Sequence, residues 1–196
     1  MRKLVVSEFL TLDGVMQSPG YPDEDPSGGF EYGGWQMPLF DDAARKVITE
    51  GMAATGGFLL GRVTYEIFAG YWPTAPAEEP LAEIINSLPK YVVSTTLEEP
   101  LAWNNSHLIK GDVAGEVTKL KHETGKDLQV IGSGELVQTL MRHDLIDEYR
   151  LMINPVVLGK GKRLFREGVP KNSLQLVDSE TSSTGVLIAT YQPAER

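Results

Sequence analysis

The chain contains no cysteine, and this absence excludes several kinds of chemistry at once. Without thiols there is no disulfide, no thiolate nucleophile and no sulfur-ligated zinc. Histidine is also scarce: His107, His122 and His143 are the three present, and their spacing matches no metal-binding motif. We therefore expect no metal site and no metal-dependent catalysis.

Positive charge is in short supply as well. Lys and Arg number 18 against 27 Asp and Glu, which gives a formal net charge of -9. The resulting field repels phosphate backbones and anionic lipid, and no stripe of Lys or Arg reverses it locally. We therefore expect neither nucleic acid nor a membrane as partner. A small anionic ligand remains compatible, because helix N-termini and single arginines create local positive potential.

The N-terminus lacks a long hydrophobic run. Residues 1–10 pass directly from Arg2 and Lys3 into a short alternating strand, without the apolar stretch and cleavage site of a signal peptide. A cytoplasmic location is the resulting expectation. The length of 196 residues suits one core, and no repeat or linker divides the chain, so we expect a single domain over residues 1–196.

Strand-like and helical patterns alternate along most of the chain. After a first strand at 3–12, residues 16–34 are rich in Pro, Gly, Asp and Glu and form a candidate lid, and a helix is expected from Pro38 to Met52. Gly56-Gly57 punctuates the pattern before the next strand at 58–60. Further helices are expected at 63–69, 81–88, 112–122 and after Gly134, and further strands at 91–94, 108–109, 128–131, 148–157, 174–179 and 185–191. This rhythm predicts an α/β fold with a mostly parallel sheet, helices on both faces and an antiparallel C-terminal addition.

The strongest local signal lies between Leu128 and Leu136, where a buried strand passes through Gly132-Ser133-Gly134 into a helix. Glycine lets backbone N–H groups approach a phosphate closely, and the helix N-terminus adds about half a positive charge. Val137 stands where a regular Rossmann fingerprint has its third glycine, which argues against that fold. The pattern indicates a phosphate-binding turn; a plain strand-to-helix turn capped by Ser133 is the alternative.

Two other strand ends carry polar groups. Arg62 follows Gly61 and could bind a 2′-phosphate through paired guanidinium donors, with Thr64 on the pyrophosphate; a surface ion pair is the alternative for Arg62. Ser94 and Thr95 end a third strand, where an ordinary hydrogen-bonded turn is the alternative. Ligands of open α/β sheets bind beyond the carboxyl ends of the strands. The coincidence of three such signals predicts one nucleotide site.

Four segments, read in order, carry a family resemblance: SEFLTLDGV at 7–15, LGRVTYE at 60–66, IGSGEL at 131–136 and PVVLGKG at 155–161. Together they resemble the C-terminal reductase domain of the bifunctional riboflavin-biosynthesis deaminase-reductase, a family similar in fold to dihydrofolate reductase. The resemblance extends from about Met1 to Tyr191. No deaminase signature is present, so the chain looks like a stand-alone reductase domain.

The resemblance implies a three-layer dihydrofolate reductase-like fold with an eight-stranded mixed sheet, a homodimer, and NADPH bound across the strand ends. It implies an activity like that of 5-amino-6-(5-phosphoribosylamino)uracil reductase or dihydrofolate reductase. The segment 16–34 has no clear counterpart in it. The cofactor residues that it implies are Gly61, Arg62 and Thr64 on the phosphates, Ser94 and Thr95 at the adenosine-phosphate turn, and Gly132, Ser133, Gly134 and Glu135 at the pyrophosphate.

Reduction by hydride transfer also needs a proton donor. Asp13 ends the first strand beside the nicotinamide site that the resemblance implies, although an Asp-Gly turn explains it too. Asp41 lies near the position of the catalytic carboxylate of dihydrofolate reductase, but Phe40 occupies the strict equivalent, which argues against pterin reduction. A helix-start acid is the alternative for Asp41, and water is the alternative donor.

Four aromatic side chains could offer a flat apolar face to a planar heterocycle, with core packing as the alternative for each: Trp35, Tyr65, Tyr71 and Trp72. The sequence therefore predicts an NADPH-dependent reductase of a small heterocyclic substrate, pterin-like or a riboflavin-precursor pyrimidine, with Asp13 or Asp41 as the acid. A non-catalytic nucleotide-binding or ligand-sensing protein on the same fold is the competing hypothesis.

Overall fold

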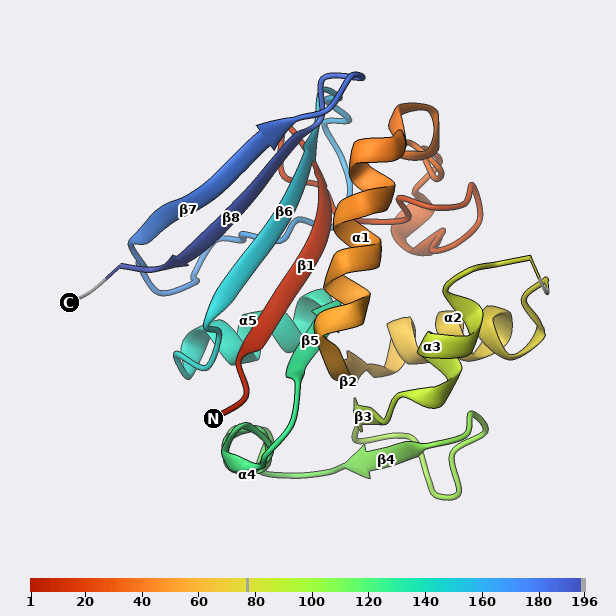
Figure 1. Cartoon of the computed structure of the whole chain (residues 1–196), viewed down its shortest axis with the longest axis vertical. Coiled ribbons are helices and arrows are strands. Elements are labelled where there is room, and N and C mark those ends of the chain that lie inside the picture. The colour runs from red at the N-terminus through yellow and green to blue at the C-terminus, as the bar shows by residue number, and fades with distance from the viewer. Residues whose placement is uncertain (77, 195–196) are drawn as a thin grey trace.

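An eight-stranded sheet organises the computed structural model, which describes residues 1–76 and 78–194 (Figure 1). Its strands are β1 (Leu4–Thr11), β2 (Thr55–Gly61), β3 (Lys90–Val93), β4 (Ser106–Ile109), β5 (Asp127–Ile131), β6 (Glu148–Asn154), β7 (Leu174–Thr181) and β8 (Leu187–Pro193). Their order across the sheet is β4-β3-β2-β5-β1-β6-β8-β7. Pairing is parallel from β4 to β6, whereas β8 is antiparallel to both β6 and β7. The predicted mixed sheet with an antiparallel C-terminal strand pair is confirmed.

Helices cover both faces of this sheet. They are α1 (Asp42–Ala54), α2 (Arg62–Tyr71), α3 (Ala82–Ser87), α4 (Val113–His122) and α5 (Gly134–Arg142). In Figure 1, α1 runs alongside β1, while α5 lies behind β1 and β6. Ala44 of α1 packs on Met152 of β6, and the opposite face of the sheet receives the apolar stripe of α5. The predicted layers of helix, sheet and helix are therefore present.

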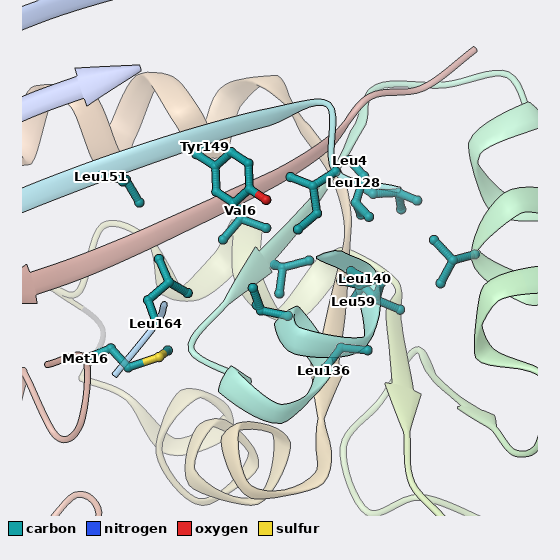
Figure 2. Packing of buried hydrophobic residues seen from close by; sticks show 14 of the residues in the cluster. Leu4, Val6, Met16, Leu59, Leu128, Leu136, Leu140, Tyr149, Leu151 and Leu164 are labelled. Carbon is teal, nitrogen blue, oxygen red and sulfur yellow. The ribbon is translucent and has the colours of Figure 1, made fainter. Parts of the chain in front are cut away.

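The main core lies between the sheet and the helices α4 and α5. Because side chains alternate along a strand, Leu4 and Val6 of β1 point to the same face, where they meet Leu128 of β5 and Leu136 and Leu140 of α5 (Figure 2). Burying such aliphatic side chains stabilises the fold by about 1.5–3 kcal/mol each. This packing fixes β1 and β5 at the centre of the sheet, where the functional turns begin.

Two local predictions were wrong. The helix expected from Pro38 begins at Asp42, because Asp41 takes the N-cap position and its carboxylate accepts a hydrogen bond from the Ala44 N–H at 3.1 Å. Gly56-Gly57 lies inside β2 instead of ending the previous element. A Cβ on Gly56 would come within 2.7 Å of the Lys126 carbonyl oxygen, so the glycine is needed for close approach to the neighbouring strand.

Candidate functional site

A cleft of about 770 Å³ opens at the carboxyl ends of the parallel strands. Its walls come from the end of β1, from α1, from the junctions that follow β2, β3 and β5, and from part of the loop 16–34. This is the place where open α/β sheets bind ligands. All the residues predicted to bind the cofactor line it: Gly61, Arg62, Thr64, Ser94, Thr95, Gly132, Ser133, Gly134 and Glu135.

The turn between β5 and α5 is locked to the turn between β2 and α2. Gly132 and Ser133 both have left-handed backbones, with φ of 57° and 56°. The Ser133 N–H donates to the Thr64 hydroxyl at 2.9 Å, and the Ser133 hydroxyl accepts from the Gly61 N–H at 3.0 Å. Ser133 therefore joins two loops, and its side chain does not cap α5 as the alternative interpretation held. The first amides of α5, for which the helix has no acceptors, lie at the cleft wall.

The cations of the cleft are all ion-paired in the part of the chain that the structure describes. Arg62 pairs with Glu66 at 2.8 Å on the surface of α2, so the surface ion pair that was its alternative exists. The remaining pairs are Arg150 with Glu148, Lys162 with Asp25, and Arg166 with Glu135. The Arg62 side chain is 44% exposed, and an exposed pair is worth only about 0–1 kcal/mol. An incoming phosphate can therefore compete for Arg62 at little cost.

Ser94 lines the cleft and also forms hydrogen bonds within its own turn. Its hydroxyl accepts hydrogen bonds from the N–H groups of Thr96 at 3.1 Å and Leu97 at 3.0 Å, which is the ordinary hydrogen-bonded turn. The turn nevertheless faces the cleft, and Thr95 lines it too. The two interpretations of this segment are thus compatible.

The half of the cleft next to α1 is mainly apolar. Its lining includes Phe9, Phe40, Val47, Ile48, Met52 and Met152. Polar groups are few here: the Gln129 amide lies between the Ser7 hydroxyl at 2.9 Å and the Thr55 hydroxyl at 2.8 Å, and Arg150 stands nearby on β6. Apolar walls with a few fixed polar groups are typical of sites for planar small molecules.

The two predicted acids lie outside the cleft lining. Asp13 accepts hydrogen bonds from Thr11 Oγ1 at 2.6 Å and from the Gly159 N–H at 2.9 Å, and it pairs with Arg163. The hydrogen bond from Thr11 is the main cause that lowers the pKa of Asp13 to about 2. This carboxylate is therefore ionised at neutral pH and ties the end of β1 to the segment after β6.

The carboxylate of Asp41, like that of Asp13, is fixed by hydrogen bonds that stabilise the fold. Besides capping α1, its carboxylate accepts from the Ser183 hydroxyl at 2.7 Å and from the Ser183 N–H at 2.9 Å. The Ser183 hydroxyl is the main cause that lowers the pKa of Asp41 to about 2. Both carboxylates are held by local hydrogen bonds and lie outside the cleft lining, so the geometry lends no support to Asp13 or Asp41 as the donor.

Of the four aromatics predicted at the substrate, Trp72 lines the cleft and Tyr71 does not, while Trp35 and Tyr65 are core residues. Trp35 is 9% exposed, packs with Val15 and Phe30, and donates its indole N–H to the Gln17 carbonyl at 2.8 Å. Tyr65 is 3% exposed, and its hydroxyl accepts from the Trp103 N–H at 2.9 Å. Neither lines the cleft, so their positions do not support direct contact with a substrate. The aromatic side chains that do line it are Phe9, Tyr21, Phe40, Phe68 and Trp72.

Sequence reasoning missed Glu8, a cleft residue of β1 that is only 6% exposed. Its Oε1 atom has no hydrogen-bond partner among the described residues. Burial raises the pKa of Glu8 well above its ordinary value, and a hydrogen bond from the Gly132 N–H opposes this shift. The signal was available: Glu8 shares a strand face with Leu4, Val6 and Leu10, where a core side chain is expected.

The loop 16–34 forms one wall of the cleft with residues 16–21, 24 and 25. Gln17 donates its amide to the carbonyls of Asp25 and Ser27, at 2.9 and 3.0 Å, and Lys162 pairs with Asp25 at 2.7 Å. At the far end the Tyr21 ring lies 5.8 Å from the ring of Tyr71, the last residue of α2. The loop thus reaches from β1 to α2; its role as a lid stays a prediction.

In the part of the chain that the structure describes, none of the helices is both long and apolar enough to span a membrane. No group of three or more His, Asp or Glu side chains is placed to hold a metal ion in residues 1–76 and 78–194.

Comparison with known proteins places the chain in a family. Its sequence matches the RibD C-terminal domain over residues 2–188. It is 30% identical over 197 aligned positions to the uncharacterized protein YyaP of Bacillus subtilis (strain 168), which covers 97% of this chain and 94% of that protein. This match extends over nearly the full length of both proteins.

Solved structures with lower identity show the same fold. A protein of Shewanella sp. PV-4, provisionally named for riboflavin biosynthesis, aligns with a TM-score of 0.70 at 23% identity and covers 98% of this chain and 99% of its own. The deaminase/5-amino-6-(5-phosphoribosylamino)uracil reductase of Thermotoga maritima aligns with a TM-score of 0.64 at 16% identity, over 98% of this chain but 57% of that larger one. The chain belongs to the RibD C-terminal domain family.

Proposed function

We propose that this protein is an NADPH-dependent reductase of a small heterocyclic substrate, of the pyrimidine type found among riboflavin precursors. The observation that carries the proposal is the meeting of the Gly61, Ser94 and Gly132 turns in one cleft, next to an apolar half-site. Membership of the RibD C-terminal domain family supports it further. The name of the Thermotoga maritima relative, which includes a phosphoribosylaminouracil reductase, supports the pyrimidine class.

The backbone around Gly132 suits a nucleotide phosphate. A Cβ on Gly132 would lie 2.8 Å from the Thr64 hydroxyl oxygen, and one on Gly134 would lie 3.1 Å from Arg166. Both glycines thus keep side-chain atoms away from a surface that a phosphate would contact. Successive left-handed residues ahead of a helix N-terminus form a concave set of amides that attracts anions.

NADPH, once bound, would supply the hydride. In our proposal the amides of Gly132, Ser133 and Gly134 hold its pyrophosphate, and Arg62 holds the 2′-phosphate. Ser94 and Thr95 border the adenosine end. The apolar half next to α1 would take the flat ring of the substrate, with Ser7, Gln129 and Arg150 available for its polar edge.

Arg62 provides a test of cofactor choice. In an Arg62→Ala variant, the affinity for NADPH should fall by about fivefold to tenfold, since one exposed charge-assisted contact is lost, while the affinity for NADH should stay unchanged. Calorimetric titration with both nucleotides measures this difference. The matched control is Glu66→Gln, which frees Arg62 from its partner and should bind NADPH at least as tightly as wild type. Equal weakening toward both nucleotides would remove Arg62 from the 2′-phosphate site.

The function itself is tested by following NADPH absorbance with 5-amino-6-ribosylaminouracil, with its 5-phosphate, and with dihydrofolate as separate substrates. We expect NADPH oxidation with a pyrimidine and little with the pterin. NADPH binding without oxidation of any member of this set would favour the non-catalytic nucleotide-binding alternative. Failure to bind NADPH would contradict the proposal.

We also propose that the protein is a homodimer that pairs through the β7 edge of its sheet. Leu176 and Val177 of β7 and Leu187 of β8 are exposed, and Figure 1 shows β7 at the outer edge, away from α1. Exposed apolar side chains on an edge strand favour association with another chain. Light scattering should give twice the mass of one chain for wild type and a monomer for Val177→Asp. A monomeric wild type at micromolar concentration would refute the dimer.

A further inference from the structure

Glu8 is an ionisable side chain on the face of β1 whose other side chains belong to the hydrophobic core. On β1 it follows Leu4 and Val6 along the face that packs against α5, the face that Figure 2 shows for those two residues. Its Oε1 atom is fully buried and has no partner among the described residues. Buried polar atoms without a hydrogen bond are rare in folded proteins and often mark functional positions.

The position of Glu8 in the sheet places it where the two halves of the cleft meet. Ser7 is in register with Ile131 of β5, so Glu8 stands level with Gly132, the first residue of the phosphate-binding turn. The Gly132 N–H hydrogen-bonds to the Glu8 carboxyl group. Its strand neighbours Ser7 and Phe9 both line the cleft on the α1 side. Glu8 therefore borders the cleft between the phosphate-binding turn and the apolar half.

The charged groups around the cleft already have partners of their own. On the side of the phosphate turn, Glu135 of α5 pairs with Arg166, and Lys162 pairs with Asp25 of the loop. On β6, beside β1, Arg150 pairs with Glu148. Glu8 forms no ion pair with any of the described residues. Burial without a cation favours the neutral, protonated form of a carboxyl group.

We propose that Glu8 is the proton donor of the cleft, a carboxylic acid that protonates the substrate atom adjacent to the carbon that accepts hydride. This inference rests on the proposed reductase function. It also gives a role to a carboxyl group that lines the cleft although it lies on the core face of β1. The raised pKa of Glu8 keeps the proton in place at neutral pH, in contrast to the lowered pKa values of Asp13 and Asp41.

The proposed reaction is the reduction of a C=N or C=O bond of the substrate by one hydride and one proton. Hydride from the nicotinamide brings two electrons to the carbon, and the π pair moves to the nitrogen or oxygen. That atom takes the proton of Glu8, which becomes a carboxylate. The oxidised nicotinamide and the reduced substrate leave, and a proton from solvent restores the acid.

The first test needs no activity. Because the ordinary pKa of a glutamate is 4.5 and that of folded Glu8 is well above it, the unfolded state releases this proton first as pH rises. The free energy of unfolding of wild type should therefore fall above pH 4.5 relative to that of Glu8→Gln. Urea titrations across a pH series measure the difference.

Glu148→Gln is the matched control for this titration. Glu148 is also a buried β-strand glutamate, but its hydrogen bond with Arg150 helps to lower its pKa against the effect of burial. The free energy of unfolding of wild type, relative to that of Glu148→Gln, should rise with pH. This is the opposite of the trend expected relative to Glu8→Gln. A Glu8→Gln curve that runs parallel to wild type across the series would show that Glu8 is an ordinary ionised carboxylate, and would overturn the proposal.

The second test is kinetic. Glu8→Gln should lower kcat by about 10²- to 10⁴-fold, the usual contribution of general acid catalysis, while NADPH affinity changes by less than about threefold. Glu8→Asp should recover part of the rate, and wild-type kcat should fall as pH rises through the pKa of Glu8. If the kcat of Glu8→Gln equals that of wild type, Glu8 is not the proton donor, but the proposed reductase function still stands. A wild type that binds no NADPH would overturn the proposed function as well, so the two failures are distinguishable.

Discussion

A Gly132→Val variant is expected to lose NADPH affinity by at least about 100-fold while it remains folded. The φ of Gly132 is 57°, a left-handed conformation that costs an ordinary residue about 1–2 kcal/mol and a β-branched one more. A Cβ there would lie 2.8 Å from the Thr64 hydroxyl oxygen. To admit valine, the Thr64 side chain and the turn must separate, which breaks the bond from the Ser133 N–H. The left-handed backbone at Gly132 is also disfavoured for valine, so we expect the amides that we assign to the pyrophosphate to be displaced.

The size of the expected loss in NADPH affinity follows from the number of hydrogen bonds to the pyrophosphate that are displaced. Hydrogen bonds to charged groups contribute about 1.5–3 kcal/mol each, so displacing two of them accounts for a 100-fold loss or more. Calorimetric titration gives the affinity, and circular dichroism verifies the fold. The control is Gly70→Ala in α2, where an added Cβ meets nothing within 4 Å and helix propensity should raise stability by about 0.5–1 kcal/mol. Tight NADPH binding by Gly132→Val would contradict the assignment of this turn.

A Gly33→Ala variant is expected to lower kcat/KM by about 10- to 100-fold through the substrate wall of the cleft. A Cβ on Gly33 would lie 2.2 Å from the Pro22 carbonyl oxygen and 2.6 Å from that of Tyr21. Both are backbone atoms, so the loop itself must shift. Overpacking of this kind costs about 1–3 kcal/mol. If turnover needs the loop in its native position, this cost corresponds to the expected fall in kcat/KM. The loop supplies Ser18, Pro19 and Tyr21 to the cleft lining.

The same variant separates the two halves of the site. NADPH affinity should change little, because the turns assigned to the nucleotide follow β2, β3 and β5 and lie outside this loop. Hydrogen exchange should show faster exchange for amides in residues 17–34 and unchanged exchange in β1. Unchanged kcat/KM together with faster loop exchange would show that the loop does not shape the substrate site.

The fold and the turns that line the cleft were predictable because their signals are local. Alternation in residues 3–12 and the apolar stripe of Leu136 and Leu140 each depend on neighbours a few positions apart. Gly132 and Gly61 mark places where a strand must end and the backbone must turn. Since parallel strands share one carboxyl edge, predicting the strands also predicted that these turns converge.

The acids were not predictable in the same way, because their chemistry depends on distant partners. Asp41 is fixed by Ser183 and Asp13 by Gly159, contacts that join opposite ends of the chain. Their catalytic role stays a prediction without geometric support. Glu8 was overlooked because a single glutamate in a strand is normally on the exposed face. Its neighbours Val6 and Leu10 on the same face were the evidence that it is buried.

The most direct measurement of the central claim is a crystal structure of the protein grown with NADPH. We predict electron density for the nucleotide along the cleft, with the pyrophosphate at the amides of Gly132 to Gly134 and the 2′-phosphate at Arg62. The nicotinamide should lie on the Glu8 side of the phosphate turn. An empty cleft at saturating NADPH, or a nucleotide bound elsewhere on the surface, would contradict the account.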